Sequence, residues 1–291
     1  MAFPNAKKIL RIGSPLSSWK LLLIAALFSR PRYRGLCHLL LRPFVHDGAI
    51  AVTYRAGTRY LKAWLRLSDI ESDFQSVLEL GTHDSYHVDH AFRPDVLVDG
   101  GGNIGLFTIR AVAEQQACGN TAMRPTICEP MTRNIDQIQR HLAANRIDAE
   151  IMQSCLGGER RSIPFYCRDA INSSFDPEKP YNSVIEVPVS LLEDAIGDRP
   201  AERILVKLDI EGMEVEVLEA FVPRNRRPVY VVGELHEFPV NAPQLERLFQ
   251  ANNWTYRFWG FADDQAMFHA CSPEALHMLP SMMAVQSGQP V

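Results

Sequence analysis

A glycine-rich segment that follows a short apolar run is the part of the sequence best suited to hold a cofactor. Residues 96–108 read Val-Leu-Val-Asp-Gly-Gly-Gly-Asn-Ile-Gly-Leu-Phe-Thr, so an apolar run ends in an acid and passes through glycines into a helical pattern. Glycine permits positive φ and close approach of the backbone to a ligand, and the free N–H groups of a helix start attract electron-rich atoms. The segment therefore predicts a strand, a ligand-binding loop and a helix.

Two cofactors fit this loop. Its glycines match the Gly-x-Gly-x-x-Gly fingerprint of dinucleotide sites, and Asp99, Gly101 and Gly105 match the Asp-x-Gly-x-x-x-Gly loop used for S-adenosylmethionine (SAM). A carboxylate at the end of the first strand would repel a pyrophosphate, whereas it suits the cationic amino-acid end of SAM, directly or through water. We therefore expect SAM, with a nicotinamide cofactor as the alternative.

The ends of two further predicted strands supply polar groups to the same cofactor. The strand at 125–128 is followed by Glu129 and Pro130, and a carboxylate at this point of such folds accepts hydrogen bonds from ribose hydroxyls. A third strand, at 149–156, is expected to end beside the adenine. The expected cofactor contacts are Asp99, Gly100, Gly101, Asn103, Gly105, Glu129, Pro130, Ser154 and Cys155.

Four titratable side chains that follow two later apolar runs are the candidates for catalysis. Asp209 and Glu211 follow one run, and Glu234 and His236 follow the next. If each pair stays extended, its two side chains point to one side, and the pairs converge at the carboxyl edge of the sheet. The alternative for Asp209 and Glu211 is capping of the following helix, and for His236 it is a structural role.

The expected general base is His236, because its unperturbed pKa near 6.5 suits proton transfer at neutral pH. Glu234 or Glu211 would orient its ring. A second interpretation places a divalent cation on Asp209, Glu211 and Glu234, where it would acidify an acceptor hydroxyl.

Alternating strands and helices indicate an α/β fold with a mostly parallel, doubly wound sheet. Segments 254–259 and 266–269 predict an antiparallel hairpin at its C-terminal end. The expected parts are a basic helical extension (1–46), a lead-in and substrate-cap subdomain (47–95), a cofactor-binding domain (96–271) and a flexible tail (272–291).

Charge is distributed unevenly along the 291-residue chain. Residues 1–46 contain eight Lys and Arg and no acid, whereas the net charge of the whole chain is −4. The rest of the chain is therefore acidic, which gives no reason to expect nucleic acid as a partner. The cationic helices predicted at 14–30 and 36–41 suit an anionic membrane surface, and the alternative is that they pack on the rest of the chain or on a second copy in a homo-oligomer.

Composition indicates a soluble protein in a reducing compartment. The hydrophobic content is 46%, and the six cysteines form no C-x-x-C pair. The most apolar run, 21–28, is shorter than the roughly 20 residues needed to span a bilayer, and no convincing signal cleavage site follows it. The expected location is the cytoplasm, with peripheral membrane contact through residues 1–46 as an open alternative.

Four blocks of the sequence resemble the FkbM family of SAM-dependent methyltransferases: 97–105, 128–130, 206–214 and 234–236. The third, Val-Lys-Leu-Asp-Ile-Glu-Gly-Met-Glu, is the most specific, since it is close to the family's Lys-x-Asp-x-Glu-Gly-x-Glu signature. The resemblance covers approximately residues 60–240. It implies a Rossmann-like class I methyltransferase fold and O-methylation of hydroxyls, often on sugars, glycolipids or polyketides.

One departure from the family pattern is Gly102, where Ala is common; we expect this change only to loosen the loop. The leading interpretation is an O-methyltransferase acting on a glycan, glycolipid or secondary metabolite. The alternatives are an NAD(P)-dependent oxidoreductase and a non-catalytic, membrane-associated protein that retains the fold.

Overall fold

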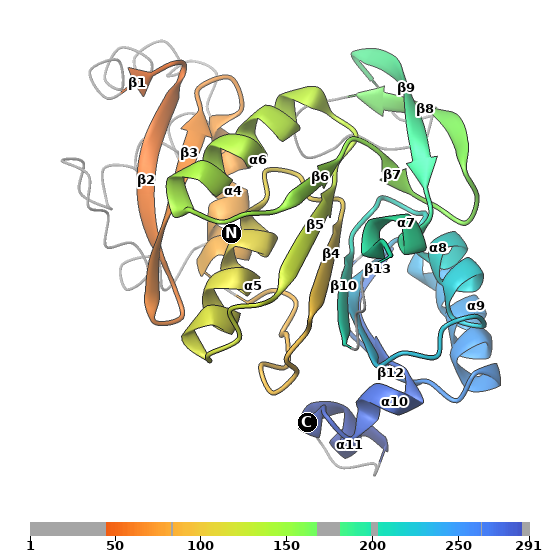
Figure 1. The fold of residues 1–291 in the computed structure, drawn as a ribbon. Coiled ribbons are helices and arrows are strands. Elements are labelled where there is room, and N and C mark those ends of the chain that lie inside the picture. Colours follow the sequence, from red (N-terminus) through yellow and green to blue (C-terminus); the bar gives the residue numbers. More distant parts are fainter. Residues whose placement is uncertain (1–44, 83, 168–180, 199–202, 263, 287–291) are drawn as a thin grey trace.

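A seven-stranded sheet forms the centre of the molecule (Figure 1). The computed structural model describes residues 45–82, 84–167, 181–198, 203–262 and 264–286, so the helices expected at 14–30 and 36–41 lie outside the described residues. The strands of the sheet are β4 (Val96–Gly100), β5 (Arg124–Cys128), β6 (Glu150–Met152), β10 (Ile204–Leu208), β11 (Val229–Leu235), β12 (Thr255–Ala262) and β13 (Gln265–Cys271). Their spatial order is β12-β13-β11-β10-β4-β5-β6.

The middle strands of this sheet are parallel and buried on both faces. β4 lies between β5 and β10, and β10 also pairs with β11, all in parallel. Every residue of β4 and β10 is buried, which explains why their sequences are mainly apolar, with Asp99 and Lys207 as the exceptions. β13 is antiparallel to both β11 and β12. The mostly parallel sheet with a C-terminal hairpin is therefore confirmed, and the hairpin places β13 between β11 and β12.

Helices cover both faces of the sheet, because alternate residues of each strand point to opposite sides. Val96 and Val98 pack in one core with α7 (Leu192–Ile196), α8 (Glu214–Phe221) and α9 (Phe238–Ala251). Leu97 faces the other side and packs in a core with Phe107 of α5 (Leu106–Ala117). α6 (Thr132–Asn145) lies beside α5. The chain is thus doubly wound, as predicted.

The lead-in segment packs on α6 through the edge of a small antiparallel sheet. This sheet consists of β1 (Val45–His46), β2 (Ala49–Ala56) and β3 (Arg59–Arg66), and α4 (Ile70–Ser76) and a π-helical segment (Val77–Thr82) follow it. The Asn145 side chain bonds both the N–H and the carbonyl of Lys62. The N–H of Trp64 donates to the His141 ring. Side chains of α6 thus complete the open edge of β3.

A second small sheet stands beyond the end of β6. Its strands are β7 (Cys155–Leu156), β8 (Arg161–Cys167) and β9 (Ser183–Ser190), in the order β7-β9-β8. The single strand expected at 149–156 is therefore wrong: its first part pairs with β5 and its second part pairs with β9. The break between them places Ser154 and Cys155 at the carboxyl edge of the central sheet, where both line a cavity.

The C-terminal segment is ordered against the body of the protein. It forms α10 (Pro273–Leu276) and α11 (Pro280–Gln286), in which Met282 is fully buried. The backbone N–H and the hydroxyl of Ser281 both donate to Asp89. The expected flexible tail is therefore wrong for 272–286, because apolar side chains anchor it. None of the helices in the described part of the chain has the length and hydrophobicity needed to cross a membrane.

Candidate active site

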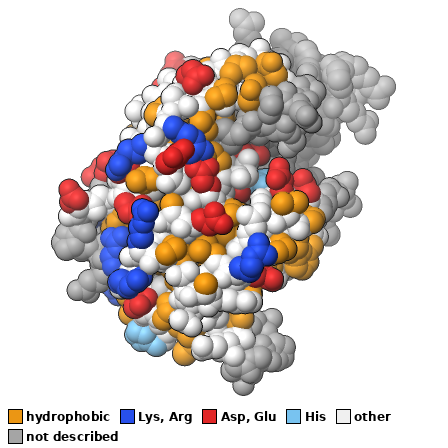
Figure 2. Space-filling view, turned by 90° about the vertical axis from the view of Figure 1, so that its right-hand side faces the viewer, with side chains coloured by type: hydrophobic (Ala, Val, Ile, Leu, Met, Phe, Trp, Pro, Cys, Tyr) orange, Lys and Arg blue, Asp and Glu red, His pale blue; other side chains and the backbone are white. Residues whose placement is uncertain are grey.

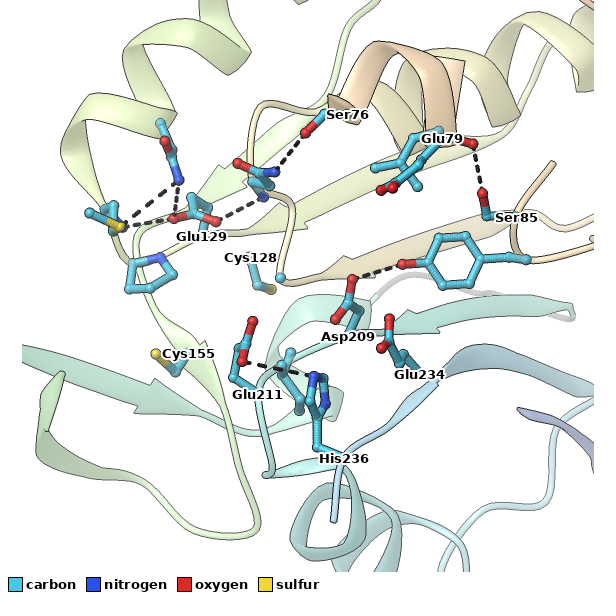
Figure 3. A pocket seen from close by; sticks show the side chains of 18 of the residues that line it. Ser76, Glu79, Ser85, Cys128, Glu129, Cys155, Asp209, Glu211, Glu234 and His236 are labelled. Carbon is cyan, nitrogen blue, oxygen red and sulfur yellow. Dashed lines mark hydrogen bonds and ion pairs between the residues drawn. The ribbon is translucent and has the colours of Figure 1, made fainter. Parts of the chain in front are cut away.

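A cavity of about 670 Å³ lies at the carboxyl ends of the parallel strands (Figure 3). Its walls come from the glycine loop, from the residues that follow β5, β10 and β11, and from the lead-in segment. Ligands of open α/β sheets bind at this edge. The polar and charged side chains that line it are Gln75, Ser76, Glu79, Ser85, Tyr86, Asn103, Glu129, Asn134, Ser154, Asp209, Glu211, Glu234, His236 and Gln265.

The glycine loop brings bare backbone to the cavity at Gly101. This residue has a φ of 72°, and a Cβ here would lie 1.9 Å from the carbonyl oxygen of Asp209, so only glycine fits. The Nζ atom of Lys207, a buried residue of β10, donates to the carbonyls of Gly100 (3.0 Å) and Gly101 (2.7 Å). A buried ammonium group therefore fixes the loop in place.

Glu129 braces the loop against the start of α6. Its carboxylate accepts hydrogen bonds from the N–H groups of Asn103 (2.8 Å) and Met131 (3.1 Å) and from the amide of Asn134 (3.1 Å). Burial raises the pKa of Glu129 to about 7, although these hydrogen bonds oppose the rise. Because a carboxylate has about four acceptor positions, Glu129 keeps capacity for one ligand hydroxyl.

Asp209 is a fixed anion in the cavity wall. The Tyr86 hydroxyl donates to its Oδ2 atom at 2.8 Å, and Lys207 Nζ lies 3.7 Å from the same oxygen. Burial opposes ionisation, but the charges of Lys207 and His236 and the hydrogen bond from Tyr86 lower the pKa of Asp209. The low pKa makes Asp209 a poor proton acceptor at neutral pH.

His236 lies next to a buried carboxylate that does not line the cavity. Its Nδ1 atom is 3.0 Å from Oε1 of Glu214, and its Nε2 atom is 3.8 Å from Oε2 of Glu211. Burial lowers the pKa of His236, but the hydrogen bond with Glu214 and the charges of Glu214, Asp209 and Glu211 raise it to about 10. The imidazole is therefore protonated at neutral pH.

Glu211 and Glu234 are the two carboxylates of this end of the cavity that titrate near neutrality. Burial raises the pKa of each to about 7, against the lowering effect of the His236 charge. Glu211 has His236 as an ion-pair partner. Among the described residues, none forms a hydrogen bond or an ion pair with the Glu234 carboxylate, which faces the cavity beside Asp209 (Figure 3). The Glu234 carboxylate thus has no described hydrogen-bond or ion-pair partner and titrates near neutral pH.

Comparison with known sequences assigns the family. The sequence model of the methyltransferase FkbM domain matches residues 79–258, which is more than half of the chain. The chain belongs to the FkbM methyltransferase family. The match includes the glycine loop and the cavity residues that follow β5, β10 and β11. Of the FkbM signature block, 206–214, Asp209, Ile210 and Glu211 line the cavity, and the mostly parallel, doubly wound sheet is the architecture that the family resemblance implied.

Solved structures with similar folds are remote in sequence. The FkbM methyltransferase of Methylobacillus flagellatus KT is 12% identical, with a TM-score of 0.42, and the alignment covers 82% of this chain and 59% of that one. A Pyrococcus abyssi tRNA (uracil-54, C5)-methyltransferase in complex with S-adenosyl-L-homocysteine is 10% identical, with a TM-score of 0.42 and coverages of 78% and 45%. The chain thus spans about half the length of these two proteins. No curated protein matches the chain significantly.

Most of the expected cofactor contacts line the cavity of this FkbM methyltransferase. Those that do are Gly101, Asn103, Glu129, Pro130, Ser154 and Cys155. Gly100 and Gly105 lie outside its wall, and so does Asp99, which is fully buried. The Asp99 carboxylate accepts a hydrogen bond from Thr108 (2.7 Å) and lies 3.4 Å from Lys207 Nζ. Because Asp99 is buried beneath the loop, this structure does not favour the direct contact with a ligand, and the expected contact through water stays a prediction.

Gly102, which stands where the family commonly has Ala, is explained by space rather than by the expected loosening of the loop. A Cβ at this position would lie 2.2 Å from Cγ2 of Ile127, which is fully buried in β5. The branched Ile127 side chain occupies the space that an alanine methyl group would need. The lack of a side chain at Gly102 therefore leaves room for the Ile127 side chain.

Three expectations about the catalytic residues need correction. All four residues line the cavity, but the first pair is not extended, because Glu211 has a φ of 60° and the chain turns there. The pKa of His236 is raised to about 10, which does not favour the expected role as base at neutral pH, and of the two carboxylates expected to orient its ring only Glu211 contacts it, together with Glu214. In the described part of the chain, no three His, Cys, Asp or Glu side chains are placed to hold a metal ion, so the expected cation site on Asp209, Glu211 and Glu234 is not formed.

Several residues of the site were missed by the sequence reasoning, and Glu214, Lys207 and Tyr86 are the ones that hold its charged groups in place. Glu214 and Lys207 both lie in the signature block 206–214, so their presence was visible although their roles were not. Tyr86 carries no local signal, since it is brought to Asp209 from 123 residues earlier in the chain.

Proposed function

We propose that this FkbM methyltransferase transfers a methyl group from SAM to a hydroxyl of a glycan, glycolipid or secondary-metabolite acceptor. The observation that carries the proposal is the Glu234 carboxylate, which faces the cavity without a described partner and has a pKa raised to about 7 by burial. Such a group suits removal of the proton that a hydroxyl loses on methylation. When bound, SAM supplies an electrophilic methyl group on a sulfonium.

Unsatisfied groups in the cavity wall support the cofactor assignment. Within the described residues, the buried atoms Asn103 Oδ1 and Ser154 Oγ have no hydrogen-bond partner. Buried polar atoms of this kind are normally satisfied, so they favour a polar ligand. Gly101 offers bare backbone beside them, and Glu129 retains acceptor capacity suited to a ribose hydroxyl. We infer that these four residues hold SAM.

The charge of the cavity supports a neutral acceptor. Five carboxylates line it, from Glu79, Glu129, Asp209, Glu211 and Glu234, and no Lys or Arg does so among the described residues. A phosphate or carboxylate on the acceptor would be repelled here, whereas hydroxyls can donate to these groups. On the face shown in Figure 2, basic side chains are interspersed with acidic ones rather than gathered in a stripe. The described part of this face therefore presents no basic stripe suited to a nucleic-acid backbone.

The described side chains divide the catalytic tasks. Alignment of acceptor oxygen, methyl carbon and sulfur supplies much of the acceleration of a displacement reaction, so the rigidity of the loop held by Lys207 matters. Asp209 stays ionised and contributes a fixed negative charge beside the reacting centre. An oxygen of the Glu234 carboxylate takes the proton of the acceptor hydroxyl.

Isothermal titration calorimetry with S-adenosylhomocysteine and NADH tests the cofactor. Micromolar binding of S-adenosylhomocysteine alone is the expected result, and substitution of Gly101 by Ala abolishes it because the Cβ has no space. Transfer of label from methyl-labelled SAM to a panel of neutral polyols, amino sugars and sugar phosphates then tests the acceptor. Binding of NADH alone would overturn the proposal. Binding of neither ligand favours the non-catalytic interpretation.

A further inference from the structure

Glu214, the first residue of α8, joins two segments of the cavity from behind. Its side chain is fully buried. Its Oε1 atom accepts hydrogen bonds from the N–H groups of Ile210 (3.0 Å) and Gly212 (3.3 Å) and lies 3.0 Å from Nδ1 of His236. One carboxylate oxygen therefore ties the turn after β10 to the residue that follows β11.

The turn that Glu214 holds is conformationally unfavourable without support. Glu211 has a φ of 60° and Gly212 a φ of 109°, and a non-glycine residue adopts the left-handed region only when its surroundings impose it. Glu214 accepts hydrogen bonds from the N–H groups of Ile210 and Gly212, which flank Glu211 in the chain. The turn directs the Glu211 carboxylate into the cavity, beside His236 (Figure 3).

Among the described residues, the charged groups with the strongest effect on the His236 ring are acidic. They are Glu214 from α8, Asp209 and Glu211 from the turn after β10, and Glu234 from β11. A buried carboxylate needs a positive partner or many donors, and Glu214 has two N–H groups and this imidazole. The amide of Asn241 donates to the His236 carbonyl at 2.8 Å and fixes its backbone.

We propose that Glu214 is a positioning residue that keeps the His236 imidazole protonated and anchors the turn bearing Asp209 and Glu211. The permanent positive charge on His236 then allows Glu211 and Glu234 to lose their protons near neutral pH in a cavity that is otherwise acidic. His236 thus acts as a fixed cation, and proton acceptance falls to a carboxylate. The part of this inference that concerns reaction rate rests on the proposed function, and the part that concerns protonation does not.

NMR spectroscopy of the ¹⁵N-labelled full chain, with and without S-adenosylhomocysteine, tests the protonation directly. The His236 ring nitrogens should show the shifts of an imidazolium at pH 8, with a titration midpoint near 10. The Glu214→Gln substitution should move the midpoint below 8, because the neutral amide no longer favours the cation. Glu219→Gln, the same change at an exposed position of α8, is the matched control and should leave the midpoint unchanged.

The pH dependence of methyl transfer provides the second measurement. Loss of the His236 charge raises the pKa of Glu211 and Glu234. The acidic limb of the pH–rate profile of Glu214→Gln should therefore move to higher pH. Turnover of this variant should be about tenfold lower at pH 7 and should recover toward pH 9. A midpoint near 6.5 for wild-type His236 would overturn the inference, and this measurement needs no variant. If Glu214→Gln lowers the titration midpoint of His236 but no methyl transfer is detected, the inference about protonation is supported and the proposed function is contradicted.

Discussion

The proton-accepting role belongs to a single side chain, Glu234. Replacing it with Gln keeps the size of the side chain but removes its capacity to take a proton, so turnover should fall by about 100-fold or more while the affinity for S-adenosylhomocysteine stays near wild type. Steady-state kinetics and calorimetry measure the two quantities. Glu237→Gln, an exposed position close by, is the matched control and should keep full turnover. Wild-type turnover of Glu234→Gln would remove the proposed base.

A charge test of the cofactor site follows from the carboxylates that titrate near 7. The pKa values of Glu129, Glu211 and Glu234 are each raised to about 7, so these groups become negative as the pH rises from 6 to 8. SAM carries a sulfonium charge that S-adenosylhomocysteine lacks. The preference for SAM should therefore increase roughly threefold to tenfold across this range, as measured by calorimetry at several pH values. A constant ratio would show that these carboxylates lie far from the sulfonium.

At the residue scale, the sequence predicted where the reactive groups would gather but not their protonation. Asp209, Glu211, Glu234 and His236 lie at or just after the carboxyl ends of two parallel strands, which meet at one edge of the sheet, so their proximity was predictable. The pKa of His236 depends on Glu214, which reaches it only through the turn of the chain at Glu211. A backbone turn of this kind is not visible in a strand-and-helix pattern.

The C-terminal helices contribute to stability through one buried side chain. Met282 in α11 is fully buried in the core that also contains Tyr86, so Met282→Ala should lower the free energy of unfolding by about 2–5 kcal/mol. Met283 is 40% exposed, and the same substitution there should change it by less than about 0.5 kcal/mol. Urea denaturation of both variants makes the comparison. Equal losses would mean that α11 does not dock on the body in solution.

At the element scale, long periodic segments were predictable and short ones were not. β4, β10 and β11 are mainly apolar and almost entirely buried, so their sequences indicate strands, and the hairpin of β12 and β13 was also predictable. The insertion of β13 beside β11 depends on tertiary pairing alone. α10 and α11 are too short for a helical period, so only their contacts with the body define them.

At the scale of the whole molecule, charge separates the chain into two parts. Residues 1–46 hold eight Lys and Arg and no acid, although the net charge of the chain is −4. The cavity is lined by carboxylates without Lys or Arg among the described residues. An acidic body would itself be repelled by an anionic membrane, so any attraction to such a surface must come from the basic segment. We propose that residues 1–46 place the enzyme at a membrane that presents its acceptor.

Sedimentation with vesicles containing phosphatidylserine tests this placement. Each Lys or Arg near an anionic surface contributes about 1 kcal/mol, so the full chain should co-sediment at low salt, and 0.5 M NaCl should weaken the binding by screening. A chain that begins at residue 47 should lose the binding but keep its affinity for S-adenosylhomocysteine, since no residue before 75 lines the cavity in the described structure. Equal sedimentation of both forms would contradict the membrane role. If neither form binds vesicles, and truncation changes the sedimentation-equilibrium mass from that of a dimer to that of a monomer, the segment would instead belong to a contact between two copies of the chain.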